Sequence, residues 1–285
     1  MIAAVGSRLA RLALCAAPLL GCGGGGPLLH PAHTLPEGSV TFAAGTSGKL
    51  ALGGLARGEE KLRAAVATRG GATTADERRG FAQGALVRFA AAPGVAPFAA
   101  ARVGLGHHNE AGLSYLGRAL RVDGRHAFEW QSVALSLGLA ASGMLTRAGD
   151  RPARELMGPD SGLRSVDATS LSGYGLELPV MFGYRSSADV VLLWAGLRGG
   201  FERDSFHARL VESPDVQFAT SGAALRFWGG GLVGFAVGLP PVQVRTEVNV
   251  AYERVQGYLL TGGGKLEADV AGWSLTPGLA ISAKF

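Results

Sequence analysis

The sequence predicts an all-β protein, a closed antiparallel transmembrane β-barrel with ten strands, and it leaves eight or twelve strands open. Apolar residues alternate with polar or small ones over several stretches of about ten residues. Turn signals separate these stretches in an alternating short and long order. Only 17% of the residues are charged, and mean hydropathy is positive (+0.22). This balance suits a wall with lipid on one side and water on the other.

Residues 1–21 are predicted to be an export signal. Arg8 and Arg11 form a basic start, and the apolar run from Leu12 to Leu20 follows them. This run has the length of a signal-peptide core and is too short to cross a bilayer as a helix. Without Arg8 and Arg11, 25 basic residues face 22 acidic ones. So small an excess gives no nucleic-acid signature, and no nucleic-acid partner is expected.

Residues 19–22 read Leu-Leu-Gly-Cys, which resembles the lipobox of bacterial lipoproteins, although Leu20 stands where Ser or Ala is commoner. The resemblance implies that Cys22 carries the lipid as the first residue of the mature chain. Cys15 and Cys22 are the only cysteines, so the mature body holds no disulfide. An ordinary signal peptide with an incidental Cys22 is the alternative. In both cases residues 22–37, which begin with a glycine tract, are expected to form a flexible tether.

The stretches 174–184 and 242–253 show the strand period most clearly. Successive side chains of a strand point to opposite faces, so one face of each stretch is expected to contact lipid. In 174–184 that face is Tyr174, Leu176, Leu178, Val180, Phe182 and Tyr184. In 242–253 valines and Tyr252 alternate with Gln, Arg, Glu and Asn. The apolar run 227–242 contains five glycines, which disfavour a helix.

The last stretch keeps the same period up to a C-terminal aromatic residue, Phe285. Trp273, Leu275 and Leu279 share its face, and Pro277 predicts a bulge or local break. An alternating last strand with an aromatic end resembles the assembly signal of bacterial outer-membrane β-barrel proteins. The resemblance covers residues 38–285 as an architecture. It implies an outer-membrane location, contact with outer-membrane lipids, and recognition by the barrel-assembly machinery through the strand that ends at Phe285.

Ten strands follow from four short turns and five longer loops, and this even number puts both termini on the periplasmic side. The turns are predicted at 92–96, 122–125, 185–189 and 239–241. The loops are predicted at about 48–80, 107–111, 140–170, 202–218 and 256–268. The strands would be 38–47, 81–91, 97–106, 112–121, 126–139, 171–184, 189–201, 219–237, 243–255 and 269–285.

Seven charged residues are predicted to face the lumen of this barrel: Arg102, Glu177, Arg198, Arg226, Arg245, Glu247 and Glu253. A ten-stranded barrel is only slightly wider than one that side chains fill, and an unpaired charge there is costly. We therefore expect a network of ion pairs that keeps the barrel shut. A narrow conducting path lined by arginines is the functional alternative.

Aromatic residues near the ends of the lipid-facing stretches are predicted to anchor the barrel at the two membrane interfaces. These residues are Tyr174, Phe182, Tyr184, Phe201, Phe235, Trp273 and Phe285. The alternative is that they form the core of a soluble β lipoprotein, tethered through Cys22, that binds a small apolar ligand.

No motif predicts an enzyme, a metal site or a cofactor. The cluster at 107–110 (His-His-Asn-Glu) lacks a further His or Cys at ligand spacing. Asp204, Ser205 and His207 keep open a second hypothesis, a membrane-embedded hydrolase, but they lack the aspartate pattern of outer-membrane proteases. The expected function is an integral outer-membrane barrel with a structural or surface role, or a narrow porin-like channel.

Overall fold

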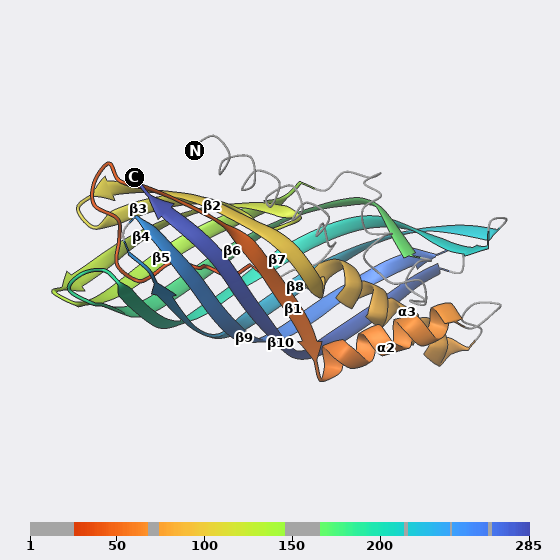
Figure 1. The fold of residues 1–285 in the computed structure, drawn as a ribbon. Coiled ribbons are helices and arrows are strands. Elements are labelled where there is room, and N and C mark those ends of the chain that lie inside the picture. Colours follow the sequence, from red (N-terminus) through yellow and green to blue (C-terminus); the bar gives the residue numbers. More distant parts are fainter. Residues whose placement is uncertain (1–25, 68–73, 146–165, 214–215, 240, 262–263) are drawn as a thin grey trace, which may run out of the picture.

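The computed structural model describes residues 26–67, 74–145, 166–213, 216–239, 241–261 and 264–285. Within them, ten strands form one closed antiparallel barrel (Figure 1). Each strand pairs with its neighbours in the sequence, and β1 pairs with β10 to close the wall. The strands are β1 (Val40–Leu52), β2 (Gly94–Gly106), β3 (Asn109–Tyr115), β4 (Ala119–Trp130), β5 (Val133–Met144), β6 (Val166–Arg185), β7 (Val191–Ser213), β8 (Val216–Val237), β9 (Val242–Thr261) and β10 (Gly264–Lys284).

The fold class and the strand number are confirmed, but the predicted strand 81–91 is wrong. Residues 81–91 lie in helix α3 (Ala75–Leu86) and in the π-helical turn η1 (Val87–Ala91) that continues it. Their buried residues Ala82, Ala85, Leu86 and Phe89 recur at steps of three and four, which is helical spacing. The number of strands is still ten, because residues 109–144 form three strands and the prediction had two there.

Two of the predicted connections between strands also differ from the structure. The sequence at 122–125 is the middle of β4, where Asp123 and Arg125 are buried in the lumen. Its polar, glycine-containing composition resembles that of a turn, although it belongs to a lumen-facing segment. A longer outer loop was predicted at 107–111. The structure has a two-residue turn at 107–108 instead, and this turn lies at the same end of the barrel as Val40 and Phe285. His107 and His108 there have φ angles of 51° and 57°, as a tight hairpin turn of the primed type requires.

The alternation of faces agrees with the observed burial. Along β6, residues 174, 176, 178, 180, 182 and 184 are exposed, while the residues between them are buried. Tyr174 and Tyr184 enclose ten residue steps, which is about 33 Å along the strand and about 25 Å along the axis at the usual tilt of about 40°. This height is that of the apolar band of transmembrane barrels. Beyond Tyr174 the strands β6 to β10 continue past this band.

Pro277 interrupts the β1–β10 ladder without changing its register. The pairs Ser47–Gly278 and Leu50–Leu275 lie on either side of the gap and keep the same alignment. Proline has no N–H to donate, so the predicted local break is present and a bulge is not.

Two helices and η1 cover the end of the barrel opposite to Phe285 (Figure 1). They lie between β1 and β2 as α2 (Gly54–Ala67), α3 and η1. Their buried residues form one apolar cluster with Phe206, Val255, Leu259 and other inward residues of β6 to β10. Phe89 of η1 stacks on Phe206 with 4.6 Å between the ring centroids. We call α2, α3 and η1 together the outer cap. Among the described residues, no helix is long and apolar enough to cross a membrane.

The helix α3 begins with a capping box. The Thr74 hydroxyl accepts a hydrogen bond from the Glu77 backbone N–H at 3.2 Å, and Glu77 accepts one from the Thr74 N–H at 2.9 Å. Thr74→Ala should cost about 1 kcal/mol of helix stability, and Thr74→Ser should cost little. Hydrogen exchange should detect this as roughly fivefold faster exchange of the first α3 amides in Thr74→Ala only. Equal exchange in both variants would show that the cap does not depend on this box.

Candidate functional site: the closed lumen

The lumen holds two layers of charged side chains. The layer nearer to Val40 and Phe285, which we call the inner layer, contains three arginines and three carboxylates. All six are at most 7% exposed: Arg102, Arg125, Arg245, Glu110, Asp123 and Glu247. Arg102 contacts Glu110 and also Asp123, the latter at 2.5 Å. Arg125 contacts Glu110 at 2.9 Å.

The N-terminal segment 26–36 lies inside the barrel at this layer. Leu28, Leu29, His30, Ala32 and His33 are each less than 5% exposed. The inward faces of two strands contain glycines where the segment passes. A Cβ atom at residue 183 would lie 2.8 Å from the Ala32 Cβ, and one at residue 278 would lie 2.8 Å from the Pro27 Cβ. Larger residues would collide with the segment, so the wall is shaped to accept it.

Charged side chains of the wall bind the backbone of this segment. The Glu247 carboxylate accepts hydrogen bonds from the N–H groups of Leu28 and Leu29 at 2.8 and 2.9 Å. It also accepts one from the Trp194 indole at 3.0 Å. Hydrogen bonds to charged partners are stronger than neutral ones. A single wall carboxylate therefore holds the backbone of Leu28 and Leu29.

Further contacts continue along the segment. Arg125 donates to the carbonyl oxygens of Pro31 and, at 2.9 Å, His33. Glu110 accepts from the Leu35 N–H at 2.9 Å. The prediction of a flexible tether at 22–37 is therefore wrong for residues 26–36, because the wall supplies partners for their backbone that the glycine-rich sequence does not reveal. Residues 22–25 lie outside the described residues.

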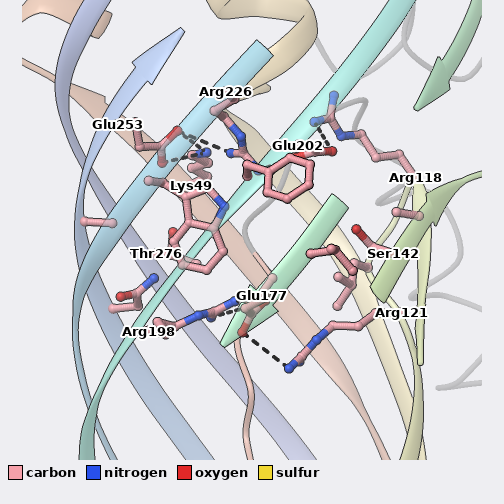
Figure 2. Close-up of a pocket in the computed structure, with 18 residues that line it drawn as sticks. Lys49, Arg118, Arg121, Ser142, Glu177, Arg198, Glu202, Arg226, Glu253 and Thr276 are labelled. Carbon is pink, nitrogen blue, oxygen red and sulfur yellow. Dashed lines mark hydrogen bonds and ion pairs between the residues drawn. The ribbon is translucent and has the colours of Figure 1, made fainter. Parts of the chain in front are cut away.

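The second layer surrounds a central cavity of about 90 Å³ (Figure 2), and Gly26 of the N-terminal segment is part of its lining. Eight charged side chains line it: Lys49, Arg118, Arg121, Arg198, Arg226, Glu177, Glu202 and Glu253. Ser142, Asn249, Thr276 and Trp228 add polar and aromatic surface.

Each carboxylate of the cavity has two cationic partners. Glu177 contacts Arg198 at 2.7 Å and Arg121 at 3.3 Å (Figure 2). Glu253 contacts Lys49 at 2.8 Å and Arg226 at 3.2 Å. Carboxylates that bridge two cations in this way link strands far apart in the sequence and stiffen the lumen.

The third carboxylate connects the cavity to the outer cap. Glu202 contacts Arg226, and it lies 3.6 Å from Arg118. Arg118 in turn donates to the carbonyl oxygens of Phe89 and Ala90 at 2.5 and 2.9 Å. A residue of the β3–β4 turn thereby joins the helical insertion to the ion-pair network.

The structure brings all seven predicted lumen charges inside the barrel and divides them between the layers. Arg245 and Glu247 belong to the inner layer with Arg102, whereas the other four, Glu177, Arg198, Arg226 and Glu253, line the cavity. Sequence reasoning missed Lys49, Glu110, Arg118, Arg121, Asp123, Arg125 and Glu202. Most of these fall in 107–125, where the strand boundaries were misplaced, and Glu202 was assigned to a loop. The alternation of charged with apolar residues along 119–130 was the signal that could have identified three of them.

Six of the seven predicted interface aromatics are exposed on the outer wall: Tyr174, Phe182, Tyr184, Phe235, Trp273 and Phe285. Phe201 lies on the outward side of β7 but is partly buried, and its ring centroid is 6.5 Å from that of Phe227. Trp273 packs edge-on against Tyr252 at 5.4 Å. Five described aromatic residues that were not predicted at the interface are also exposed: Phe42, Phe128, Trp130, Phe227 and Tyr252.

The barrel wall separates Asp204 from Ser205 and His207, which share the outward face of β7. His207 lies on the outward face of β7 and interacts with Ser170 of β6 at 2.9 Å, between Nδ1 and Oγ. Asp204 is fully buried on the inward face, so it cannot orient His207 as a catalytic triad requires. Within the described residues, no group of three His, Cys, Asp or Glu side chains could hold a metal ion.

The comparisons with known proteins found structural similarity only, since no family model and no curated protein matches the chain. Neisserial surface protein A is 10% identical, with 87% of this chain and 96% of that chain covered and a TM-score of 0.30. A major outer membrane protein from Thermus thermophilus is 12% identical, with 86% and 99% covered and a TM-score of 0.35. Ail, the attachment invasion locus protein of Yersinia pestis, is 11% identical, with 88% and 100% covered and a TM-score of 0.27. These proteins are bacterial β-barrels, and TM-scores below 0.5 carry no argument about the function of this chain, whose fold is established by its own strand pairing.

Proposed function

We propose that this protein is an integral outer-membrane β-barrel that is closed at rest and has a structural or surface role. The observation that carries the proposal is the double closure of the lumen. Residues 26–36 fill the inner half, and the outer cap fills the opposite end. The exposed apolar wall, about 25 Å high between its aromatic residues, supports the membrane location.

Heat modifiability and conductance test this proposal together. The detergent-extracted protein should migrate differently on a gel with and without boiling, because a closed barrel resists detergent until it is heated. The same preparation should give no discrete conductance steps in a planar bilayer. A gel without a mobility shift would contradict the closed barrel. Regular conductance steps would show an open pore instead of a closed lumen.

A charge on the lipid-facing wall distinguishes a membrane barrel from a soluble one. Leu178 is 62% exposed and lies near the middle of the stretch between Tyr174 and Tyr184 on β6. Leu178→Arg should lower the free energy of unfolding in lipid vesicles by about 2–4 kcal/mol. Leu260→Arg, at an exposed position eight residues beyond Tyr252, should have little effect. Equal unfolding curves for the two variants would favour the soluble lipoprotein.

A narrow channel is a second candidate, and the central cavity favours it. The segment 26–36 is held by hydrogen bonds and packing, so its departure would join the cavity to the periplasmic side. Such a channel would open only if the outer cap moves as well, and it would pass only small solutes. An enzymatic role is not proposed, and unchanged hydrolytic activity in His207→Ala would exclude a role for that side chain.

The proposed route to the membrane uses both ends of the sequence. Residues 1–21 would direct export, and the barrel-assembly machinery would recognise β10, whose outward face ends at Phe285. The Gly26 carbonyl oxygen accepts a hydrogen bond from Arg198 inside the lumen at 2.5 Å. Because only three residues separate Cys22 from Gly26, insertion of a lipid on Cys22 into the membrane would compete with binding of the segment 26–36 in the lumen. Mass spectrometry of the mature N-terminus decides between a lipidated and a free residue.

A further inference from the structure

The central cavity contains more positive than negative charge. Among the described residues, five cationic side chains line it, Lys49, Arg118, Arg121, Arg198 and Arg226, whereas three carboxylates do. The inner layer differs, since its three arginines face three carboxylates. Asp204 lies one inward position beyond Glu202 and does not line the cavity. Even if Asp204 is counted as charged, the cavity layer keeps a positive excess.

The excess is located at Arg121. This side chain is 2% exposed, and its closest carboxylate contact is one long hydrogen bond, from Nη2 to Glu177 at 3.3 Å (Figure 2). Its Nε and Nη1 atoms have no hydrogen-bond partner among the described residues. Glu177 is shared with Arg198, which holds it more closely at 2.7 Å. A buried guanidinium with unused donors is costly unless another group accepts from it.

Other groups at the cavity have the same unused capacity. The Nε atoms of Arg198 and Arg226 lack partners within the part of the chain that the structure describes. Trp228 lies under the Arg198 guanidinium at 4.7 Å and fixes its plane. The cavity thus presents guanidinium donors from several strands, and planar guanidinium groups match the oxygens of phosphate and carboxylate.

We propose that this cavity is a binding site for a small inorganic oxyanion of the size of phosphate or sulfate. A volume of about 90 Å³ holds about six to nine waters, so an anion of five heavy atoms fits and a sugar phosphate or a lipid headgroup does not. The anion would neutralise the charge excess and accept from Arg121. The site thereby extends the closed-barrel proposal to a bound ligand that joins β4, β7 and β8 across the lumen.

The test uses the full chain refolded in detergent, so that phosphate is present while the barrel forms around the cavity. Inorganic phosphate is titrated at constant ionic strength, with chloride as the reference anion, and the apparent Tm is measured. Phosphate should raise Tm in a saturable manner and chloride should not. Sulfate should act like phosphate if the site recognises the oxyanion geometry.

Variants locate the effect. Arg121→Gln should weaken the phosphate response at least tenfold. Arg254→Gln should leave it unchanged, because Arg254 is an exposed arginine that pairs with Asp269 on the outer surface at 2.6 Å. If Arg121→Gln fails to fold, Arg121→Lys keeps the charge but removes the planar guanidinium donors, and it should also weaken the response.

Two outcomes would overturn the site. Equal responses in Arg121→Gln and Arg254→Gln, or an equal effect of chloride, would assign the response to surface charge. A heat-modifiable wild-type protein with no phosphate response would exclude the anion site and leave the closed barrel standing. Loss of heat modifiability in the wild type would instead contradict the barrel proposal itself.

Discussion

A variant that lacks residues 26–36, and in which a short Gly-Ser loop replaces residues 54–91, should conduct ions in a planar bilayer. The first change empties the inner half of the lumen, and the second removes α2, α3 and η1 from the opposite end. The remaining cavity layer carries a positive excess, so the path should favour anions. The wild-type protein should give no steps under the same conditions.

The single changes are the matched controls for this prediction. Each leaves one closure in place, so each should stay closed or show only rare openings. Gly278→Leu offers a milder route to the first change, because a side chain there collides with Pro27. A double variant that is heat-modifiable but does not conduct would show that the ion-pair layer alone closes the lumen. Conductance in the wild type would contradict both closures.

Glu110→Ala should lower the free energy of unfolding by about 3–5 kcal/mol, because it leaves two buried arginines without their shared carboxylate. Glu110 is 1% exposed and contacts both Arg102 and Arg125. It also accepts from the Leu35 N–H, so the change should loosen the segment 26–36 as well. Urea unfolding in lipid vesicles measures the change, provided that the slope of the transition stays constant.

An exposed pair provides the comparison for Glu110. Glu267 contacts Lys265 at 2.6 Å on the outer surface, where water screens the interaction. Glu267→Ala should therefore unfold like the wild type. Similar unfolding of the two variants would show that the inner-layer network contributes no more than a surface ion pair.

The sequence identified the later strands better than the earlier ones, for a physical reason. Strands β6 to β10 are 20 to 23 residues long, and a period of two is clear over such lengths. The strand β3 has only seven residues, which is short for a period of two to be clear. The centre of β4 is polar and contains glycine, so its composition resembles that of a turn. The helical spacing within 75–91 depends mostly on buried glycine and alanine residues, so its apolar period is weak.

The sequence by itself determined the closed antiparallel barrel, its outward apolar face and the inward direction of seven charged residues. Each of these depends on the alternation of side chains along one strand, which is a local property. The tertiary structure alone decided that residues 26–36 occupy the lumen, that the β1–β2 insertion closes the opposite end, and which charges pair. Glu247 and Leu28, for example, are 219 residues apart. Only closure of the barrel brings them together, because the partner of a buried charge is set by the wall facing it and not by its neighbours in the chain.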